Sequence, residues 1–274
     1  MTRGALLFAQ NNSEIDYVKM AIFAAQQITK YLNVPVSLVT DVNCADLDLH
    51  FDHVIETTAT SPYIKSFRDG ADKTVKLEWK NTSRADSFDI TPYDETLVID
   101  TDYIINSSNL SYCWNQPNDF LIYQKSYDLA HWRDKREFDL VSDHSIPFYW
   151  ATAFWFRKTQ MTGTLFDLIK EIRTNWVYYK LAYQIHSTNF RNDYAFSIAI
   201  HMLNGFGPGF FAQQLPGKMF YTLDSDLLLA HSDDSMHFLV EKQNSSAEYI
   251  SLKTKGLDVQ VMNKYSLIRL ITNE

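Results

Sequence analysis

The stretch Thr96-Leu97-Val98-Ile99-Asp100-Thr101-Asp102 decides the fold. Its apolar run is typical of a strand that is buried on both faces, as in the centre of a parallel sheet. The two acids that follow are one residue apart, and alternation along an extended chain places their side chains on one face. We therefore expect a buried strand that ends in a pair of carboxylates.

The segments before this strand have the order of a βαβ unit. Residues 4–9 form an apolar strand, Ser13 is the expected N-cap of a helix, and apolar residues recur at helical spacing over residues 17–31. Further strands are expected at residues 36–40 and 51–55. This order predicts an α/β fold with a mostly parallel central sheet and helices on both faces.

The later half of the chain is less regular. A strand is expected at residues 148–156, and helices are expected at residues 160–174 and 192–203. Residues 60–95 are polar and mixed, and residues 218–274 alternate short strands and turns. We find no repeat or linker, so the sequence predicts a single domain with an irregular C-terminal part.

Composition argues against several classes of protein. The formal net charge is -8, whereas nonspecific electrostatic binding of nucleic acid needs a basic face. Two cysteines are too few for a disulfide framework and fit a reducing cytoplasm. No apolar run is long enough to span a bilayer. A local basic groove stays open, and its candidate members are Lys65, Arg68, Lys73, Lys76 and Lys80.

The paired acids at the strand end predict a cation site. Two carboxylates on one side of the chain repel each other and need a cation or a proton. Mg²⁺ and Mn²⁺ prefer oxygen ligands and leave positions for phosphate oxygens, and open α/β sheets bind ligands at the carboxyl ends of their strands. The same acid-x-acid pattern recurs at Asp46-Leu47-Asp48 and Asp224-Ser225-Asp226. No buried strand precedes those copies, so we expect solvated turn acids there.

At residues 96–102 the chain resembles glycosyltransferases of the GT-A type, especially those of family 8, in which an apolar strand ends in D-x-D. Residues 80–95 and 190–199 resemble uncharacterised phage proteins of this type. By order of elements the resemblance covers roughly residues 4–205. It implies a GT-A fold in which about 1–115 form the nucleotide-sugar-binding half and about 116–274 form the acceptor-side half.

The resemblance also implies roles for individual residues. Asp100 and Asp102 would bind Mn²⁺ or Mg²⁺ and, with Thr101, the diphosphate of the donor, which is expected to be a UDP-sugar. Arg84 would lie near the phosphates, and Asp86 would contact the donor sugar. Alternatively, Arg84 forms a surface ion pair with Asp86 or Asp89, which contributes little to stability.

Three other segments would complete the site. The end of the first strand, Ala9-Gln10-Asn11, would border the nucleotide. Trp150-Ala151-Thr152 would line the donor sugar and the acceptor, although Trp150 can also be a core residue. Asn192-Asp193 would lie beside the reacting carbon as the catalytic pair. Asp193 alternatively stabilises the start of a helix through the helix dipole.

The third metal ligand departs from the family pattern. Family 8 enzymes supply a C-terminal histidine in a setting that includes a glycine, whereas Leu239 and Val240 follow His237-Phe238 here. His231 is another candidate, and Lys264 would reach the diphosphate instead. The sequence therefore leaves the identity of the third metal ligand undecided.

These features predict metal-dependent transfer of a sugar from a nucleotide-sugar to a hydroxyl group. The acceptor is either a hydroxymethylated pyrimidine in phage DNA or a glycan or protein. A nucleotidyltransferase is an alternative, but that class needs a glycine-rich loop where Gln10-Asn11-Asn12 stands. A non-catalytic protein that binds nucleotide-sugars is the other alternative, and a missing third ligand would favour it.

Overall fold

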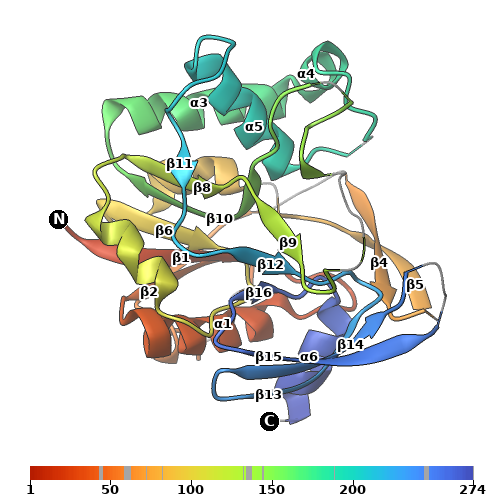
Figure 1. Ribbon diagram of the computed structural model, residues 1–274. Helices are drawn as coiled ribbons and strands as arrows, with labels where there is room; N and C mark the ends of the chain where they lie inside the picture. The colour runs from red at the N-terminus through yellow and green to blue at the C-terminus, as the bar shows by residue number, and fades with distance from the viewer. Residues whose placement is uncertain are drawn as a thin grey trace.

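A seven-stranded sheet forms the centre of the protein in the computed structural model (Figure 1), which describes residues 1–42, 46–58, 63–71, 73–81, 83–131, 133, 138–143, 145–187, 189–243 and 247–273. Across the sheet its strands are β11 (Gln213–Gln214), β8 (Phe120–Tyr123), β10 (Trp150–Arg157), β6 (Glu95–Ile99), β1 (Arg3–Ala9), β2 (Val36–Thr40) and β3 (His53–Glu56). Only β10 runs against the other strands of this sheet. The predicted mostly parallel α/β sheet is therefore confirmed.

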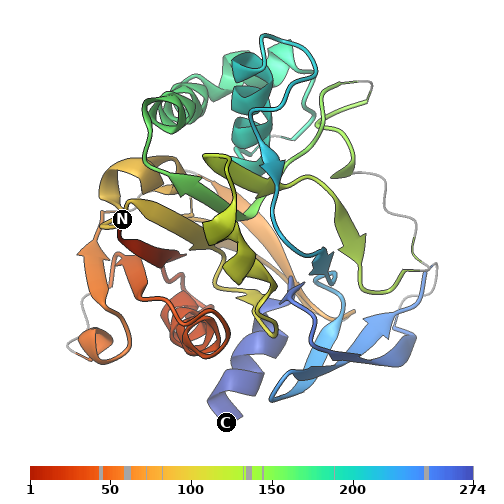
Figure 2. The same ribbon diagram turned by 60° about the vertical axis from the view of Figure 1, so that its left-hand side comes forward.

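Helices cover both faces of this sheet (Figures 1 and 2). Helix α1 (Tyr17–Leu32) packs on β1 and β2, and α6 (Lys264–Asn273) packs on α1. On the opposite face α5 (Asn192–Leu203) packs on β10, and α3 (Gln160–Thr174) packs on α5. Within the described ranges, no helix combines the length and apolar character that a membrane span requires.

The start of α1 differs from the prediction. Asp16 is the N-cap, and its carboxylate accepts the backbone N–H of Lys19 at 3.1 Å. Ser13 lies one turn too early, so the predicted N-cap is wrong. The helix ends at Asn33, whose φ of 52° places it in the left-handed region that a C-cap adopts.

The segments that the sequence left irregular contain further elements. β4 (Ile64–Asp69) and β5 (Lys73–Glu78) form an antiparallel hairpin within residues 60–95. In the C-terminal part a three-stranded sheet consists of β13 (Leu227–Ser232), β14 (Ser235–Glu241) and β15 (Tyr249–Lys255). A four-stranded sheet has the order β7 (Tyr103–Ile104), β16 (Val259–Gln260), β12 (Met219–Tyr221) and β9 (Ser126–Asp128). The short helices are η1 (Leu47–Leu49), η2 (Ser83–Asp86), α2 (Ser87–Ile90), η3 (Asn109–Asn115) and α4 (Trp176–Ala182).

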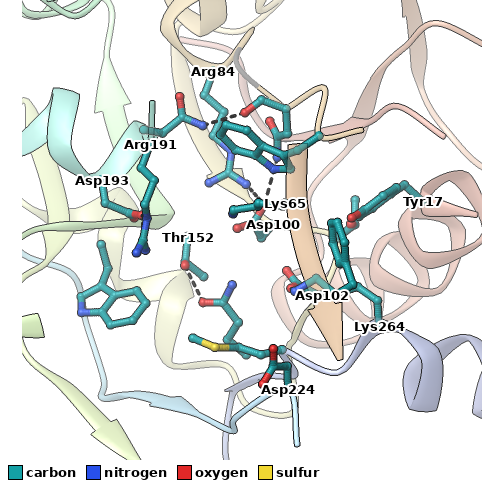
Figure 3. Close-up of a pocket in the computed structure, with 18 of the residues that line it drawn as sticks. Tyr17, Lys65, Arg84, Asp100, Asp102, Thr152, Arg191, Asp193, Asp224 and Lys264 are labelled. Atoms are coloured by element: carbon teal, nitrogen blue, oxygen red, sulfur yellow. Dashed lines mark hydrogen bonds and ion pairs between the residues drawn. The ribbon is translucent and has the colours of Figure 1, made fainter. Parts of the chain in front are cut away.

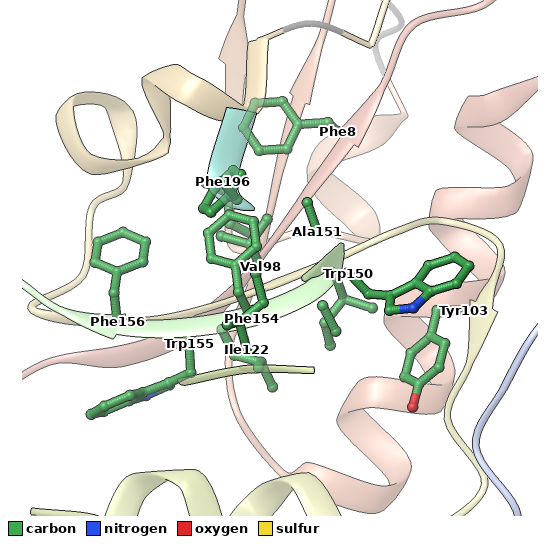
Figure 4. Close-up of a cluster of buried hydrophobic side chains, with 14 of the residues drawn as sticks. Phe8, Val98, Tyr103, Ile122, Trp150, Ala151, Phe154, Trp155, Phe156 and Phe196 are labelled. Atoms are coloured by element: carbon green, nitrogen blue, oxygen red, sulfur yellow. The ribbon is translucent and has the colours of Figure 1, made fainter. Parts of the chain in front are cut away.

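Aromatic side chains fill the core on both sides of β10 (Figure 4). Phe154 packs against Phe196 of α5 with ring centroids 4.6 Å apart, and Phe156 packs against Phe166 of α3 at 4.8 Å. Trp155 points to the other face, as alternation along a strand requires. This packing anchors α5, whose first residues contribute to the cavity described below.

One buried carboxyl group, that of Asp258, links the start of β16 to the loop after β7. Its oxygens accept the backbone N–H of Asn106 and the hydroxyl of Ser107, each at 2.8 Å. Burial raises the pKa of Asp258 from an ordinary 3.8 to about 6. The folded state therefore holds this proton more tightly than the unfolded state does, and the resulting stabilisation is lost as the pH rises from about 4 to about 6.

We expect the Asp258→Asn variant to lose this pH dependence. At about 1.4 kcal/mol for each pKa unit, the stability of the wild-type protein should fall by about 3 kcal/mol relative to the variant between about pH 3 and about pH 7. Urea unfolding of both proteins across that range measures the difference. Parallel stability curves would show that Asp258 titrates normally in the folded state.

Candidate functional site

A cavity of about 280 Å³ opens at the carboxyl end of β6 (Figure 3). The chain leaves the strand in a turn, in which the N–H of Tyr103 donates to the carbonyl of Asp100 at 3.1 Å. The extended geometry thus ends at Asp100, yet Asp100, Thr101 and Asp102 all line the cavity. The three residues at the end of β6 therefore lie beside one cavity.

Opposite charges are balanced around this cavity. Among the described residues, its lining includes four basic and four acidic side chains: Lys65, Arg84, Arg191 and Lys264, and Asp100, Asp102, Asp193 and Asp224. They come from β4, η2, the start of α5, the start of α6, the turn after β6 and the loop after β12. Segments far apart in the sequence are therefore required to assemble the site.

Asp100 is paired with a buried arginine. The guanidinium of Arg84 donates to the carboxylate of Asp100 and to the carbonyl of Ala151, and only 5% of the Arg84 side chain is exposed. Asp86 instead forms a bidentate ion pair with Arg173 of α3, at 2.9 and 3.0 Å. The expected surface pair between Arg84 and Asp86 is therefore absent from the described contacts, and Asp86 lies outside the cavity lining.

Asp102 is paired with a lysine from the C-terminal helix. The ammonium of Lys264 lies 2.5 Å from a carboxylate oxygen of Asp102, which is almost fully buried. The backbone carbonyl of Asp102 also accepts the N–H of Val261 at 2.8 Å. These contacts attach the start of α6 to the turn that carries the acids.

The side chains present fit a divalent cation poorly. Both carboxylates that would bind it already have a basic partner, and a divalent ion beside Lys264 and Arg84 would be repelled by them. His231 and His237 lie in the β13–β14 sheet, where they bond to Asn106 at 2.9 Å and Ser251 at 2.7 Å. Across the described ranges, no three His, Cys, Asp or Glu side chains gather closely enough to hold a metal ion.

Asp193 is fully engaged by hydrogen bonds. One carboxylate oxygen accepts the N–H of Ala151 at 2.9 Å, and the other accepts two N–H groups of Arg191 at 2.7 and 3.0 Å. Both carboxylate oxygens of Asp193 therefore already accept hydrogen bonds. The geometry therefore favours a positioning role for the predicted catalytic Asp193, in addition to its place in the first turn of α5.

Three neighbours of Asp193 present polar atoms at the cavity. Asn192 donates to the carbonyl of Asn81 at 3.0 Å, while its own side-chain oxygen is buried and has no hydrogen-bond partner among the described residues.

Trp150 and Thr152 of β10 also line the cavity. The indole N–H of Trp150 has no hydrogen-bond partner among the described residues, although its ring stacks on Tyr221. Thr152 donates to Gln260 at 2.5 Å. Trp150 is thus both a core residue and part of the cavity lining.

Two charged groups in the cavity form no ion pair within the part of the chain that the structure describes. Lys65 lies over the ring of Trp79 at 4.4 Å. Burial, together with repulsion by Arg191 and Lys264, lowers the pKa of Lys65 to about 7. Burial also raises the pKa of Asp224, although the nearby charges of Arg68 and Lys264 act to lower it.

Sequence reasoning assigned Asp224 incorrectly. It lies at the cavity, and Asp226 of the same tripeptide is buried against Arg133, so the expected solvated turn is wrong there. Asp46 and Asp48 are exposed, as expected for the other copy. The tripeptide gives no signal that separates these cases, because the difference lies in which distant segment packs on it.

The predicted nucleotide-bordering residues lie outside the lining of this cavity. Ala9 and Gln10 are buried at the end of β1. The side chain of Asn11 accepts the N–H of Val18 and donates to Asp16, each at 3.1 Å, so it organises the start of α1.

The candidate basic groove is also divided. Lys65 lies at the cavity, whereas Lys73 pairs with Glu14 at 2.9 Å and Lys80 pairs with Asp41 at 3.0 Å. These three side chains therefore serve different contacts and do not form one basic surface.

A second cavity of about 550 Å³ lies at the carboxyl ends of β2 and β3, and residues 40–42 and 56–58 line it. Asp41 directs one carboxylate oxygen to Lys80, and the other is buried without a partner among the described residues. Both cavities are thus at strand ends of the same sheet, where open α/β sheets bind ligands.

Two glycosyltransferases of known structure are distantly similar to this chain. No protein-family model and no curated protein match it. The glycosyltransferase GlyE of Streptococcus pneumoniae TIGR4 is similar over 74% of this chain at 11% identity and a TM-score of 0.41, and the match spans 43% of GlyE. The galactosyltransferase LgtC, solved with donor and acceptor sugar analogs, matches 72% of this chain and 70% of its own at 12% identity and a TM-score of 0.45. The likeness to both glycosyltransferases is distant.

Proposed function

We propose that the protein transfers a sugar from a nucleotide-sugar to a hydroxyl acceptor at the Asp100–Asp102 cavity. One observation carries this proposal: the basic groups of Lys65, Arg84 and Lys264 gather at the carboxyl edge of an α/β sheet, beside buried polar atoms that have no hydrogen-bond partner among the described residues. Basic groups suit the diphosphate of such a donor, and the polar atoms suit sugar hydroxyls.

The two cavities suit the two ends of the donor. Asp41 offers a buried carboxylate oxygen to a ribose hydroxyl at the ends of β2 and β3. The diphosphate then lies at Arg84 and Lys264, and the sugar faces Asn192 and Trp150. The division into a donor half before about residue 115 and an acceptor half after it is part of the same proposal.

Asp224 is the carboxylate that we assign to the acceptor. As the acceptor oxygen bonds to the sugar carbon, the bond from that carbon to the diphosphate breaks, and Asp224 takes the acceptor proton. A buried carboxyl group with a raised pKa suits this role. Asp193, with both oxygens engaged, orients Arg191 and the backbone of Ala151.

The remaining features of the reaction stay predictions. A bound Mn²⁺ or Mg²⁺ at Asp100 and Asp102 would neutralise the leaving diphosphate, but Arg84 and Lys264 occupy both carboxylates. We also propose a UDP-sugar as the donor, and modified DNA, a glycan or a protein as the acceptor.

Incubation with a panel of nucleotide-sugars tests the proposal. We expect at least one donor to raise the melting temperature and to release nucleoside diphosphate, either by transfer or by slow hydrolysis. Each donor is tested with EDTA and with Mn²⁺, and modified DNA and simple sugars serve as acceptors. Absence of binding and of release with every donor in both conditions would refute the function, and binding without release would favour a non-catalytic protein.

A further inference from the structure

We propose that Lys65, together with Arg84 and Lys264, neutralises the donor diphosphate in place of a divalent metal ion. This inference rests on the proposed function and concerns how the same cavity neutralises the negative charge of its ligand. It also departs from the metal-dependent reaction that the sequence predicts, because the donor set around Asp100 and Asp102 fits a divalent cation poorly.

The arrangement of charges leaves one basic group available. Arg84, Arg191 and Lys264 each pair with an aspartate of the cavity. Lys65 has no such partner among the described residues. Burial and then the like charges of Arg191 and Lys264 lower its pKa, and this outweighs the attraction of Asp193 and Asp102. An ammonium in these surroundings is unfavourable until an anion arrives. A diphosphate supplies that anion.

Arg84 and Lys264 retain unused hydrogen-bond donors. The Nε–H of Arg84 is buried and finds no partner among the described residues. Lys264 has three donor hydrogens, and its described ion pair is with Asp102. Both groups can therefore bond to phosphate oxygens, and such charge-assisted bonds stabilise a leaving diphosphate as a metal ion would.

The β4–β5 hairpin delivers Lys65 to the cavity. Lys65 pairs with Leu77 across the hairpin, and Lys76 pairs with the neighbouring Ser66. Trp79, which follows β5, lines the cavity and lies beneath the Lys65 ammonium. Lys76 is exposed and lies outside the lining, so it offers a matched control on the same hairpin.

Binding of inorganic pyrophosphate and of UDP, measured by titration calorimetry, tests the inference. In EDTA we expect the wild-type protein to bind both, and Mn²⁺ to change the Kd of UDP by less than about 3-fold. Lys65→Met should weaken binding on the order of 10- to 100-fold, the size of a lost charge-assisted hydrogen bond. Lys76→Met should bind as the wild type does.

Proton uptake gives a readout that a purely structural role would not change. Because Lys65 has a lowered pKa, diphosphate binding at pH 8 should draw a proton onto it in the wild type, seen as a dependence of the binding heat on the buffer. Lys65→Arg, which stays charged, should bind within a few-fold of the wild type without that proton uptake.

The outcomes separate the inference from the proposed function. Binding that EDTA abolishes and Mn²⁺ restores would overturn the inference while leaving glycosyl transfer intact. Wild-type affinity in Lys65→Met would overturn it as well. Failure of UDP and of every nucleotide-sugar to bind, with or without Mn²⁺, would overturn both.

Discussion

The Asp226→Ala variant is expected to lose about 3–5 kcal/mol of unfolding free energy. Asp226 forms two hydrogen bonds with Arg133, both at 2.8 Å, and Arg133 also binds Asp128 at 2.6 and 2.7 Å. At most 4% of each of these three side chains is exposed. Removal of one carboxylate leaves a buried guanidinium with a single acidic partner, which is costly because the charge remains out of water.

Asp48 provides the matched control, because it occupies the same third position in another acid-x-acid tripeptide. It is exposed, so Asp48→Ala should change the unfolding free energy by no more than about 0.5 kcal/mol. Urea unfolding of the two variants measures the contrast. Equal, small losses would mean that the Arg133 ion pairs contribute nothing to stability.

These two copies show which part of the site a sequence can predict. The tripeptide itself shows which side chains are present. The apolar or polar character of the residues before it indicates whether it follows a buried strand. The copy after β6 could be predicted to follow a buried strand because Leu97, Val98 and Ile99 are apolar, and parallel strands bind ligands at that end. Its actual partners, Arg84 and Lys264, come from segments that no local pattern connects to it.

The fold shows the same division between local and distant information. The β1, β2 and β6 strands and the α3 and α5 helices have strong hydrophobic periodicity, and they were predicted within a residue or two. The β4–β5 hairpin was not, because it is rich in charged residues and only Phe67 and Leu77 are buried. Helix α6 was missed because its Tyr and Ile residues also favour strands.

Asp224→Asn is expected to lower the rate of sugar transfer by about 10²- to 10⁴-fold, the usual contribution of a general base. The amide keeps the shape of the side chain but cannot take the acceptor proton. Asp224 has no ion pair among the described residues, so its replacement should leave donor affinity and the unfolding free energy nearly unchanged. Asp46→Asn, at the first position of the exposed tripeptide, is the control and should retain full activity.

The pH dependence of transfer distinguishes a base from a residue that merely orients the acceptor. Burial raises the pKa of Asp224, and the reaction requires its ionised form, so the wild-type rate should fall as the pH drops through a value above that of an ordinary carboxyl group. This acidic limb should be missing from the residual activity of Asp224→Asn. If Asp224→Asn keeps the acidic limb, or loses acceptor affinity while kcat is retained, Asp224 does not take the proton of the acceptor hydroxyl. The departing diphosphate would then be the base.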